Sequence, residues 1–335
     1  MSRTAYVVQK GATVRREGDL LKVYVGTKLE ADVPVHDLRQ LVVMGNVMLT
    51  PGAIDLLLGK GIDTVLLTWH GRYRGRLVGT GSSHVALRMA QYETLRDKGK
   101  ALGIAKAIVR GKVRNQRSFL LRRAREGRDA EALLRGAMSM RATMARLESC
   151  ETMDEVRGCE GAAAASYFRV FGELLTAEGF RFDGRNRRPP MDPVNAMLSL
   201  GYTLLANVVE ASVQVVGMDP YLGALHAPEA GRPSLVCDLQ EEFRTPVVDA
   251  LVVAAVNKQV MEPGDFEDAG QGEPVVIKQE AVRGFVRLFE RRLERAVMYE
   301  PTGKRLTYRG VVEQQARRLA RCFLEGEEYV SFDPR

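Results

Sequence analysis

The chain contains little cysteine, with four residues among 335. The four include no Cys-x-x-Cys pair, and their spacing matches neither a zinc knuckle nor a small disulfide framework. We therefore expect reduced cysteines with structural roles. Internal repeats and low-complexity segments are also lacking, which excludes a solenoid or a fibrous architecture.

Long hydrophobic runs are missing as well. The longest mostly apolar stretch, residues 196–209, is too short to span a bilayer. The N-terminus leads into a mixed strand pattern rather than into the apolar segment of a signal peptide. We expect a cytoplasmic protein with no membrane partner.

Length and charge set further limits. A chain of 335 residues exceeds what one ordinary core organises, so two domains are expected, with a single large helical core as the second choice. The net charge of +7 and the pI of about 9.3 favour a polyanionic partner. Residues 96–128 hold twelve Lys or Arg against Asp97 and Glu126 alone, so this stretch should face solvent or, as we prefer, phosphate.

Short apolar runs broken by turn residues fill the first eighty positions. They indicate strands at 6–8, 12–14, 20–25, 41–43 and 64–68. A short helix is expected at 51–58, with proline in its first turn and glycine past its end. We predict that residues 1–80 form a small β-rich, sandwich-like domain.

After the turn-rich residues 79–83, the pattern changes to long helical runs. Two prolines and a glycine within residues 183–190 indicate that this segment is a loop between two helical runs. The predicted fold class is α+β, in which the β-rich domain precedes a larger, mainly α-helical domain at 84–335. Helices are expected at 84–98, 102–126, 130–147, 159–177, 193–216, 246–260 and 308–323, with a strand-like insertion at 273–278.

One imidazole and several carboxylates fall within the nineteen residues 226–244. If Ser234 caps a helix, Asp238 and Glu241 share one helical face, just beyond the loop that carries His226. This arrangement resembles half of a metal site. The best upstream candidate for a third ligand is Glu160, because small residues follow it and let a helix approach another backbone closely.

Imidazole and carboxylates around a divalent cation in a basic protein suggest phosphodiester chemistry. Each residue also has an ordinary explanation. Glu160 could be a solvated glutamate in the first turn of a helix, and His226 could bond only to backbone. Asp238 and Glu241 could lie on an exposed face or pair with Arg244. Only the set together favours a metal site.

Six ordered motifs lie at residues 69–72, 112–117, 160–165, 185–196, 219–226 and 238–244. They carry a family resemblance across nearly the whole chain. With them the chain resembles the CRISPR-associated endonuclease and integrase that captures new spacers, the most universal CRISPR adaptation protein, and most of all its type I-C branch. Many relatives continue the last motif with Phe-Arg-Pro, whereas this chain inserts Thr245, so we expect a different local turn with the ligands retained.

The resemblance implies that Glu160, His226 and Glu241 are catalytic residues that bind Mg²⁺ or Mn²⁺, with Asp238 as a neighbour or additional acidic ligand. It implies metal-dependent DNA cleavage, and attack by the 3′-hydroxyl of captured DNA on the leader-proximal CRISPR repeat. The residues expected to hold the DNA backbone are Arg114, Arg117, Arg187 and Arg188.

The implied partners are double-stranded DNA, a second copy of the chain that dimerises through the β-rich domain, and a small companion protein of the adaptation system. Two other classes of function stay open. A non-catalytic DNA-binding scaffold would use the acidic cluster only as a salt-bridge network. A metallohydrolase of a small phosphorylated metabolite would need a closed pocket instead of an extended basic surface.

Overall fold

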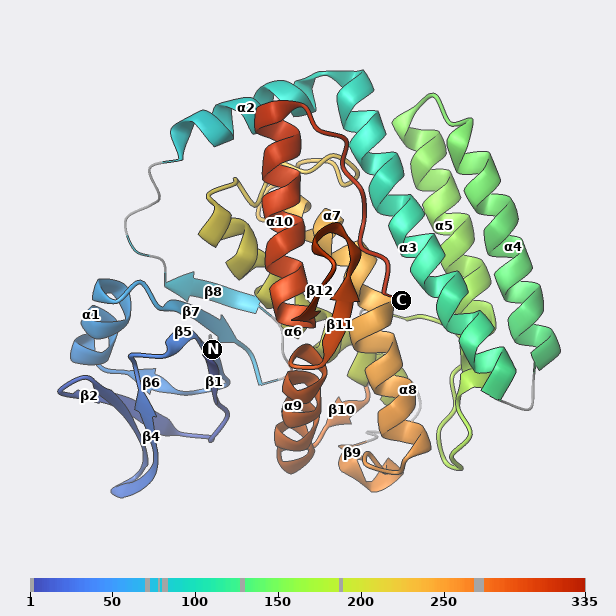
Figure 1. Cartoon of the computed structure of the whole chain (residues 1–335). Helices are drawn as coiled ribbons and strands as arrows, with labels where there is room; N and C mark the ends of the chain where they lie inside the picture. Colours follow the sequence, from blue (N-terminus) through green and yellow to red (C-terminus); the bar gives the residue numbers. More distant parts are fainter. Residues whose placement is uncertain are drawn as a thin grey trace. The chain divides into compact units, whose positions relative to one another are not determined.

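The structure is a computed structural model of the chain (Figure 1). It divides into two compact units, Met1–Ser83 and His84–Arg335. The first unit is rich in strands and the second in helices, which confirms the predicted α+β fold class. The residues that the structure describes are 3–69, 73–77, 79, 84–126, 130–186, 189–267 and 274–334.

Two four-stranded sheets make up the described part of the first unit, in the orders β1-β5-β7-β8 and β4-β3-β2-β6. In the first sheet β5 pairs in parallel with β1 and β7, and β8 closes the edge in the antiparallel direction. The second sheet is antiparallel except for a parallel β2–β6 pair. The bounds are β1 Arg3–Val7, β2 Ala12–Glu17, β3 Leu20–Val25, β4 Lys28–Pro34, β5 Leu38–Met44, β6 Met48–Leu49, β7 Asp63–Leu67 and β8 Tyr73–Leu77.

Alternating apolar side chains of these strands form one core, which also buries a face of helix α1 (Pro51–Gly59). Val14 of β2 and Leu21 of β3 are fully buried there, as the period of two along a strand requires. The sequence pattern did not predict β4 or β8. Most β4 side chains are exposed and β8 reads Tyr-Arg-Gly-Arg-Leu, so neither strand shows the apolar alternation of a half-buried strand.

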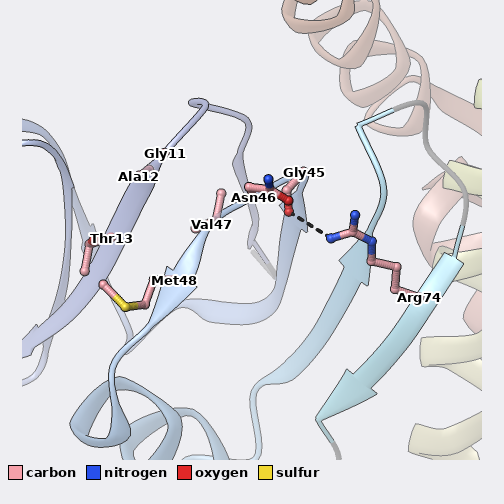
Figure 2. A pocket seen from close by; sticks show the side chains of 8 residues that line it. All are labelled: Gly11, Ala12, Thr13, Gly45, Asn46, Val47, Met48 and Arg74. Atoms are coloured by element: carbon pink, nitrogen blue, oxygen red, sulfur yellow. Dashed lines mark hydrogen bonds between the residues drawn. The ribbon is translucent and has the colours of Figure 1, made fainter.

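A pocket of about 410 Å³ opens in the first unit, beside the start of β2 and the β5–β6 connection (Figure 2). Arg74 of β8 points toward this connection, and its Nη1 donates to the Gly45 carbonyl 3.4 Å away. Arg74 is its one charged lining residue, so we assign the pocket no function. The lining residues are Gly11, Ala12, Thr13, Gly45, Asn46, Val47, Met48 and Arg74.

Long helices dominate the second unit. The bounds are α2 Val85–Arg96, α3 Lys98–Glu126, α4 Ala130–Glu148, α5 Met153–Arg169, α6 Pro193–Val216, α7 Ser234–Phe243, α8 Ala250–Asn257, α9 Gln279–Leu293 and α10 Tyr308–Glu325. Two small ladders pair β9 (Phe266–Glu267) with β10 (Val276–Ile277), and β11 (Ala296–Tyr299) with β12 (Lys304–Thr307). Helix α9 and the β11–β12 hairpin are absent from the sequence-based prediction.

Helix α6 shows why some elements were predictable. Asp192 caps it by accepting a hydrogen bond from Asn195 N at 2.7 Å, and Gly217 ends it with a left-handed φ of 97°. By length and composition this helix could cross a membrane, because its apolar stretch is longer than the residues 196–209 that the sequence analysis considered. However, 72% of its most apolar window is buried within the protein. Helix α6 therefore belongs to the core of this unit.

Helix α3 organises the site. It is 29 residues long, runs beside α4 and α5 (Figure 1), and also packs against α7. The middle of α3 is buried on several sides. Ser331 of the C-terminal segment, residues 326–334, lies so close to Gly111 that a Cβ on this glycine would not fit. The three helices α3, α5 and α7 therefore converge around the central turns of α3.

Candidate active site

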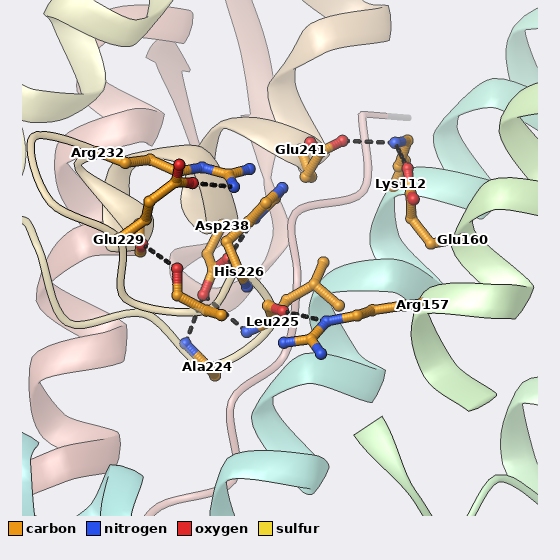
Figure 3. Close-up of polar contacts among 12 residues, drawn as sticks. Lys112, Arg157, Glu160, Ala224, Leu225, His226, Glu229, Arg232, Asp238 and Glu241 are labelled. Carbon is orange, nitrogen blue, oxygen red and sulfur yellow. Dashed lines mark hydrogen bonds and ion pairs between the residues drawn. The ribbon is translucent and has the colours of Figure 1, made fainter. Parts of the chain in front are cut away.

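Glu160 lies in the middle of α5 and not in a first turn. The helix begins at Met153 because Thr152 and Glu155 form a reciprocal capping box. This start is six residues earlier than predicted, and it excludes the explanation of Glu160 as a first-turn glutamate. Helix α5 packs on α3, and the Glu160 carboxylate faces that helix (Figure 3). The small residues after Glu160 are not needed for this contact, because Gly161 and Ala162 are exposed and a Cβ on Gly161 would meet nothing within 4 Å.

Helix α7 begins at the predicted place but not through the predicted cap. Ser234 is its first residue, and its hydroxyl donates to the Ala227 carbonyl at 2.9 Å instead of capping the helix. This bond ties the His226 loop to the start of α7. Asp238 and Glu241 both lie on α7, as expected, and both are buried.

Asp238 organises the His226 loop. Its carboxylate accepts backbone hydrogen bonds from Ala224, Leu225 and His226 at 2.6 to 3.0 Å, and its Oδ1 lies 2.6 Å from His226 Nδ1. Because this carboxylate accepts from the ring, Nδ1 is the nitrogen that carries the proton in the neutral imidazole, which leaves the lone pair on Nε2. In this arrangement Asp238 orients the histidine, and both of its oxygens are engaged by the loop.

A glycine makes this close approach possible. A Cβ on Gly223 would lie 2.7 Å from Asp238 Oδ2 and 2.8 Å from the Ser234 backbone. Any larger residue would therefore push the loop away from α7. On its other side, Arg157 of α5 donates to the Leu225 carbonyl at 3.0 Å, which connects the loop to the helix that carries Glu160 (Figure 3).

Lys112 of α3 lies between the two glutamates (Figure 3). Its ammonium forms an ion pair with Glu160 and lies 2.7 Å from Glu241 Oε2. The Lys112 side chain is 5% exposed, whereas that of Glu160 is 27% exposed, so the cluster opens to solvent on the Glu160 side. Lys112 begins the motif at residues 112–117, but the long basic run around it does not show which lysine faces inward.

Glu241 is buried and has two cationic neighbours. Burial alone would raise the pKa of Glu241, but Arg244 and Lys112 outweigh it and lower the pKa to about 2. Arg244 pairs with Oε1 at 2.7 Å, as the ordinary explanation of this glutamate proposed. Oε2 is close to Lys112 but receives no hydrogen bond of good geometry. This buried oxygen still has a lone pair directed at no donor.

The donor chemistry of Glu160, Glu241 and the free Nε2 of His226 suits a divalent cation. The orphaned Glu241 oxygen is the structural observation that fits such an ion. As the side chains stand, no three His, Cys, Asp or Glu residues of the described chain are close enough to hold a metal together. The cation that does lie between the two glutamates is the Lys112 ammonium.

Glu242 follows Glu241 on α7 and meets different partners. Its carboxylate accepts hydrogen bonds from Tyr329, Gln315 and the backbone N–H of Phe332. Burial raises the pKa of Glu242 to about 7, although these neutral donors partly oppose the shift. Glu242 therefore fastens the C-terminal segment, residues 326–334, to the back of the site.

Several cations of the basic stretch are used inside the protein, which corrects the expectation that they all face solvent or phosphate. Arg114 donates to the carbonyls of Ser331 and Phe332 at 3.1 and 2.9 Å, so it holds the C-terminal segment. Lys106 and Arg110 bind the end of α4. Arg117 is half-buried, with its Nε buried and unbonded within the described residues.

The loop before α6 also binds within the protein. Arg185 donates to Asn195 Oδ1 at 2.6 Å and stacks on Tyr202, which ties the loop to α6. The predicted DNA-binding residues Arg187 and Arg188 lie outside the described residues. So do three residues of the 69–72 motif, at positions 70–72.

After Arg244 the chain forms a π-helix, Arg244–Asp249, between α7 and α8. A π-helix accommodates an extra residue within a helical path and often occurs at functional sites. Here it lets Arg244 reach back to Glu241 and stack on Tyr202 at 5.1 Å. Tyr202 in turn donates at 2.6 Å to the buried carboxylate of Asp249.

The fold, a strand-rich unit followed by a helical unit, is shared with solved structures of a Cas1 protein and of a casposase. A Cas1 protein from Thermotoga maritima has a TM-score of 0.83 and 25% identity, covering 99% of this chain and 100% of that one. A casposase bound to integration product has a TM-score of 0.84 and 25% identity, covering 98% and 92%.

The family model described as CRISPR associated protein Cas1 matches residues 5–291. The CRISPR-associated endonuclease Cas1 3 of Thermus thermophilus is 38% identical over 323 residues, covering 95% of this chain and 93% of the relative. The endonuclease Cas1 1 of Moorella thermoacetica is 35% identical over 338 residues, covering 98% and 97%. The chain belongs to the Cas1 family, which confirms the family resemblance drawn from the six motifs.

Proposed function

We propose that this protein is a divalent-metal-dependent DNA endonuclease and integrase of CRISPR adaptation, which inserts new spacer DNA at the leader-proximal repeat. The observation that carries the proposal is the convergence of Glu160 and Glu241, from helices far apart in sequence, on one cationic position. The names of the Cas1 relatives and the likeness to a casposase bound to integration product support the same reaction class.

Glu160, Glu241 and His226 would hold Mg²⁺ or Mn²⁺. The ion, when bound, supplies Lewis-acid polarisation of a phosphodiester oxygen. The protein contributes the orientation of its ligands: Asp238 fixes the His226 tautomer, and Arg244 keeps Glu241 ionised. With the 3′-hydroxyl of captured DNA as nucleophile the product is a joined strand, and with water it is a cut strand.

The DNA backbone would be held by basic side chains near this cluster. Arg96 and Lys98 are exposed at the junction of α2 and α3, and with Arg157 they line a cavity of about 600 Å³ beside the His226 loop. Such cations bind phosphate without reading sequence. Arg114, Arg117, Arg187 and Arg188 remain proposed DNA contacts, and Arg114 also donates to the C-terminal segment.

The remaining parts of the proposal come from the family resemblance. We propose that the first unit joins two copies of the chain and that the second unit carries catalysis. The dimer would work in the cytoplasm with a small companion protein of the adaptation system, on double-stranded DNA. We also propose that the protein belongs to the type I-C branch.

One observation favours the rival, a non-catalytic DNA-binding scaffold. Lys112 and Arg244 neutralise Glu160 and Glu241, so the acidic cluster can be described as a salt-bridge network. The two functions differ in their response to chelation. A scaffold binds DNA equally well with or without EDTA and never joins strands, whereas an integrase loses joining when the metal is removed.

The decisive experiment is strand transfer of a short duplex into a repeat-bearing plasmid, with Mn²⁺ or EDTA and with the companion protein. Glu160→Ala and His226→Ala should abolish joining and leave duplex affinity nearly unchanged, because neither side chain belongs to the proposed backbone contacts. Glu178→Ala is the control, since Glu178 is an exposed acid of the same unit and belongs to none of the proposed contacts. Joining at wild-type rates by both site variants would refute the proposal.

A further inference from the structure

We propose that the Lys112 ammonium is a resident counter-ion, which a divalent cation must displace from between Glu160 and Glu241 before the site can work. The inference rests on the proposed function and adds how this chain controls metal binding. Its basis is the position of one atom. Lys112 Nζ contacts carboxylates of both α5 and α7, the two helices that supply the acidic ligands.

Charge balance is the first argument. Glu160 and Glu241 carry two negative charges, and Lys112 and Arg244 carry two positive charges. The cluster is therefore neutral without a metal. A divalent cation added to it would leave two uncompensated positive charges in a largely buried site, which is unfavourable. Withdrawal of the Lys112 ammonium removes one of these charges.

Geometry is the second argument. Glu241 Oε2 is buried and lies 2.7 Å from Lys112 Nζ, yet no hydrogen bond of good geometry joins them. The ammonium therefore neutralises this oxygen without saturating it. Arg244 differs, because it pairs with the other oxygen of Glu241 and is also held by stacking on Tyr202. Of the two cations that pair with Glu241, Lys112 is therefore the easier one for a metal ion to displace.

Side-chain chemistry is the third argument. Lysine carries a compact charge on a flexible four-carbon stem, whereas the planar guanidinium of arginine is fixed by its several donors. The cluster opens to solvent on the Glu160 side, where 27% of the glutamate side chain is exposed. The Lys112 ammonium can thus move toward water or toward a DNA phosphate when it leaves the carboxylates.

The test measures Mn²⁺ affinity of the full-length protein without DNA, by calorimetry and by the electron paramagnetic resonance signal of free Mn²⁺. Lys112→Met keeps the length of the side chain and removes its charge. If the ammonium occupies the site nine-tenths of the time, this variant should bind Mn²⁺ about tenfold more tightly than wild type. Lys100→Met is the matched control, because Lys100 is an exposed lysine of the same helix, and its affinity should not change.

Lys112→Arg keeps the charge and provides a second measurement if the methionine variant does not fold. Its forked guanidinium should hold both carboxylates more firmly, so Mn²⁺ binding should weaken. An unchanged or weaker affinity in Lys112→Met, or an unchanged affinity in Lys112→Arg, would overturn the displacement model. Glu241→Gln separates the two proposals: if wild type and this variant bind Mn²⁺ alike, the metal site itself is wrong.

Discussion

Glu241 and Glu242 are adjacent on α7 and are both buried, but they face two different regions of the molecule. Glu241 faces α3 and its own π-helix, where Lys112 and Arg244 surround it with positive charge. Glu242 faces the C-terminal segment and α10, where Tyr329, Gln315 and a backbone N–H provide neutral donors. Burial is nearly the same in both places, whereas the charge of the neighbours is not.

The difference shows that burial alone does not determine the state of a carboxylate. Desolvation would raise the pKa of both residues, yet the cations lower the pKa of Glu241 to about 2, while the pKa of Glu242 rises to about 7. One side of α7 therefore holds a permanently ionised group that is suited to a cation. The other side holds a group that binds a proton and fastens the end of the chain.

The first prediction is that replacing each glutamate by glutamine changes strand transfer to very different extents. Glu241→Gln should reduce metal-dependent strand transfer by about 10²- to 10³-fold, the range seen when one electrostatic group of a catalytic site is removed. Glu242→Gln should retain most of the activity, because the Glu242 carboxylate accepts its hydrogen bonds from the C-terminal segment and from Gln315 of α10. Initial rates with saturating Mn²⁺ measure both variants.

Each variant is the control for the other, since the two changes are chemically identical and lie one residue apart. Circular dichroism should show folded protein in both cases. Equal losses of activity in the two variants would contradict the functional difference between Glu241 and Glu242, because they would mean that both sides of α7 serve the same reaction.

The second prediction concerns stability as a function of pH. The folded pKa of Glu242 is raised from 4.5 to about 7, so the folded state binds this proton more tightly than the unfolded state does. The resulting stabilisation is fully present below pH 4.5 and is lost as the pH rises through 7. Between pH 5 and pH 8, Glu242 should lower the free energy of unfolding by about 2 to 3 kcal/mol.

Urea unfolding of wild type and Glu242→Gln across this pH range provides the measurement. The variant has no proton to lose at this position, so the stability of wild type relative to the variant should fall as the pH rises. Parallel pH profiles for the two proteins would show that Glu242 titrates normally. Glu241→Gln should not change the slope between pH 5 and 8, because Glu241 is already ionised there.

The fold was largely predictable because its signals are local. Asp192, Pro193 and Gly217 mark both ends of α6, and the helix has the predicted bounds 193–216. Helix α9 was missed although its buried residues recur at helical spacing from Ala281 to Leu293. The signal was therefore present in the sequence.

The candidate site was only partly predictable, because its partners come from distant segments. Carboxylates and a histidine are recognisable by type and motif. That Lys112 would lie between two of them cannot be read from a basic run, since the pattern of charges does not say which lysine faces inward. The same holds for Arg114, whose partners are more than 200 positions away at Ser331 and Phe332.

The smallest predicted effect concerns Asp238, the third carboxylate of α7, whose partners are backbone N–H groups and a ring nitrogen. Asp238→Asn keeps the volume but replaces one acceptor oxygen with a donor, which opposes the N–H groups of the His226 loop. The His226 ring then loses its fixed tautomer. Mn²⁺ affinity should fall by about 10- to 100-fold, as is usual when a partner of a metal ligand is removed.

Calorimetric titration of Asp238→Asn with Mn²⁺ distinguishes an orienting role from direct ligation. If Asp238 only orients His226, His226→Ala and the double variant should bind Mn²⁺ with equal affinity, since the orienting group has nothing left to orient. A further loss in the double variant would make Asp238 a ligand in its own right. In that case α7 would supply two acidic ligands, Asp238 and Glu241. Both would then differ from Glu242, which has only neutral donors around its carboxylate.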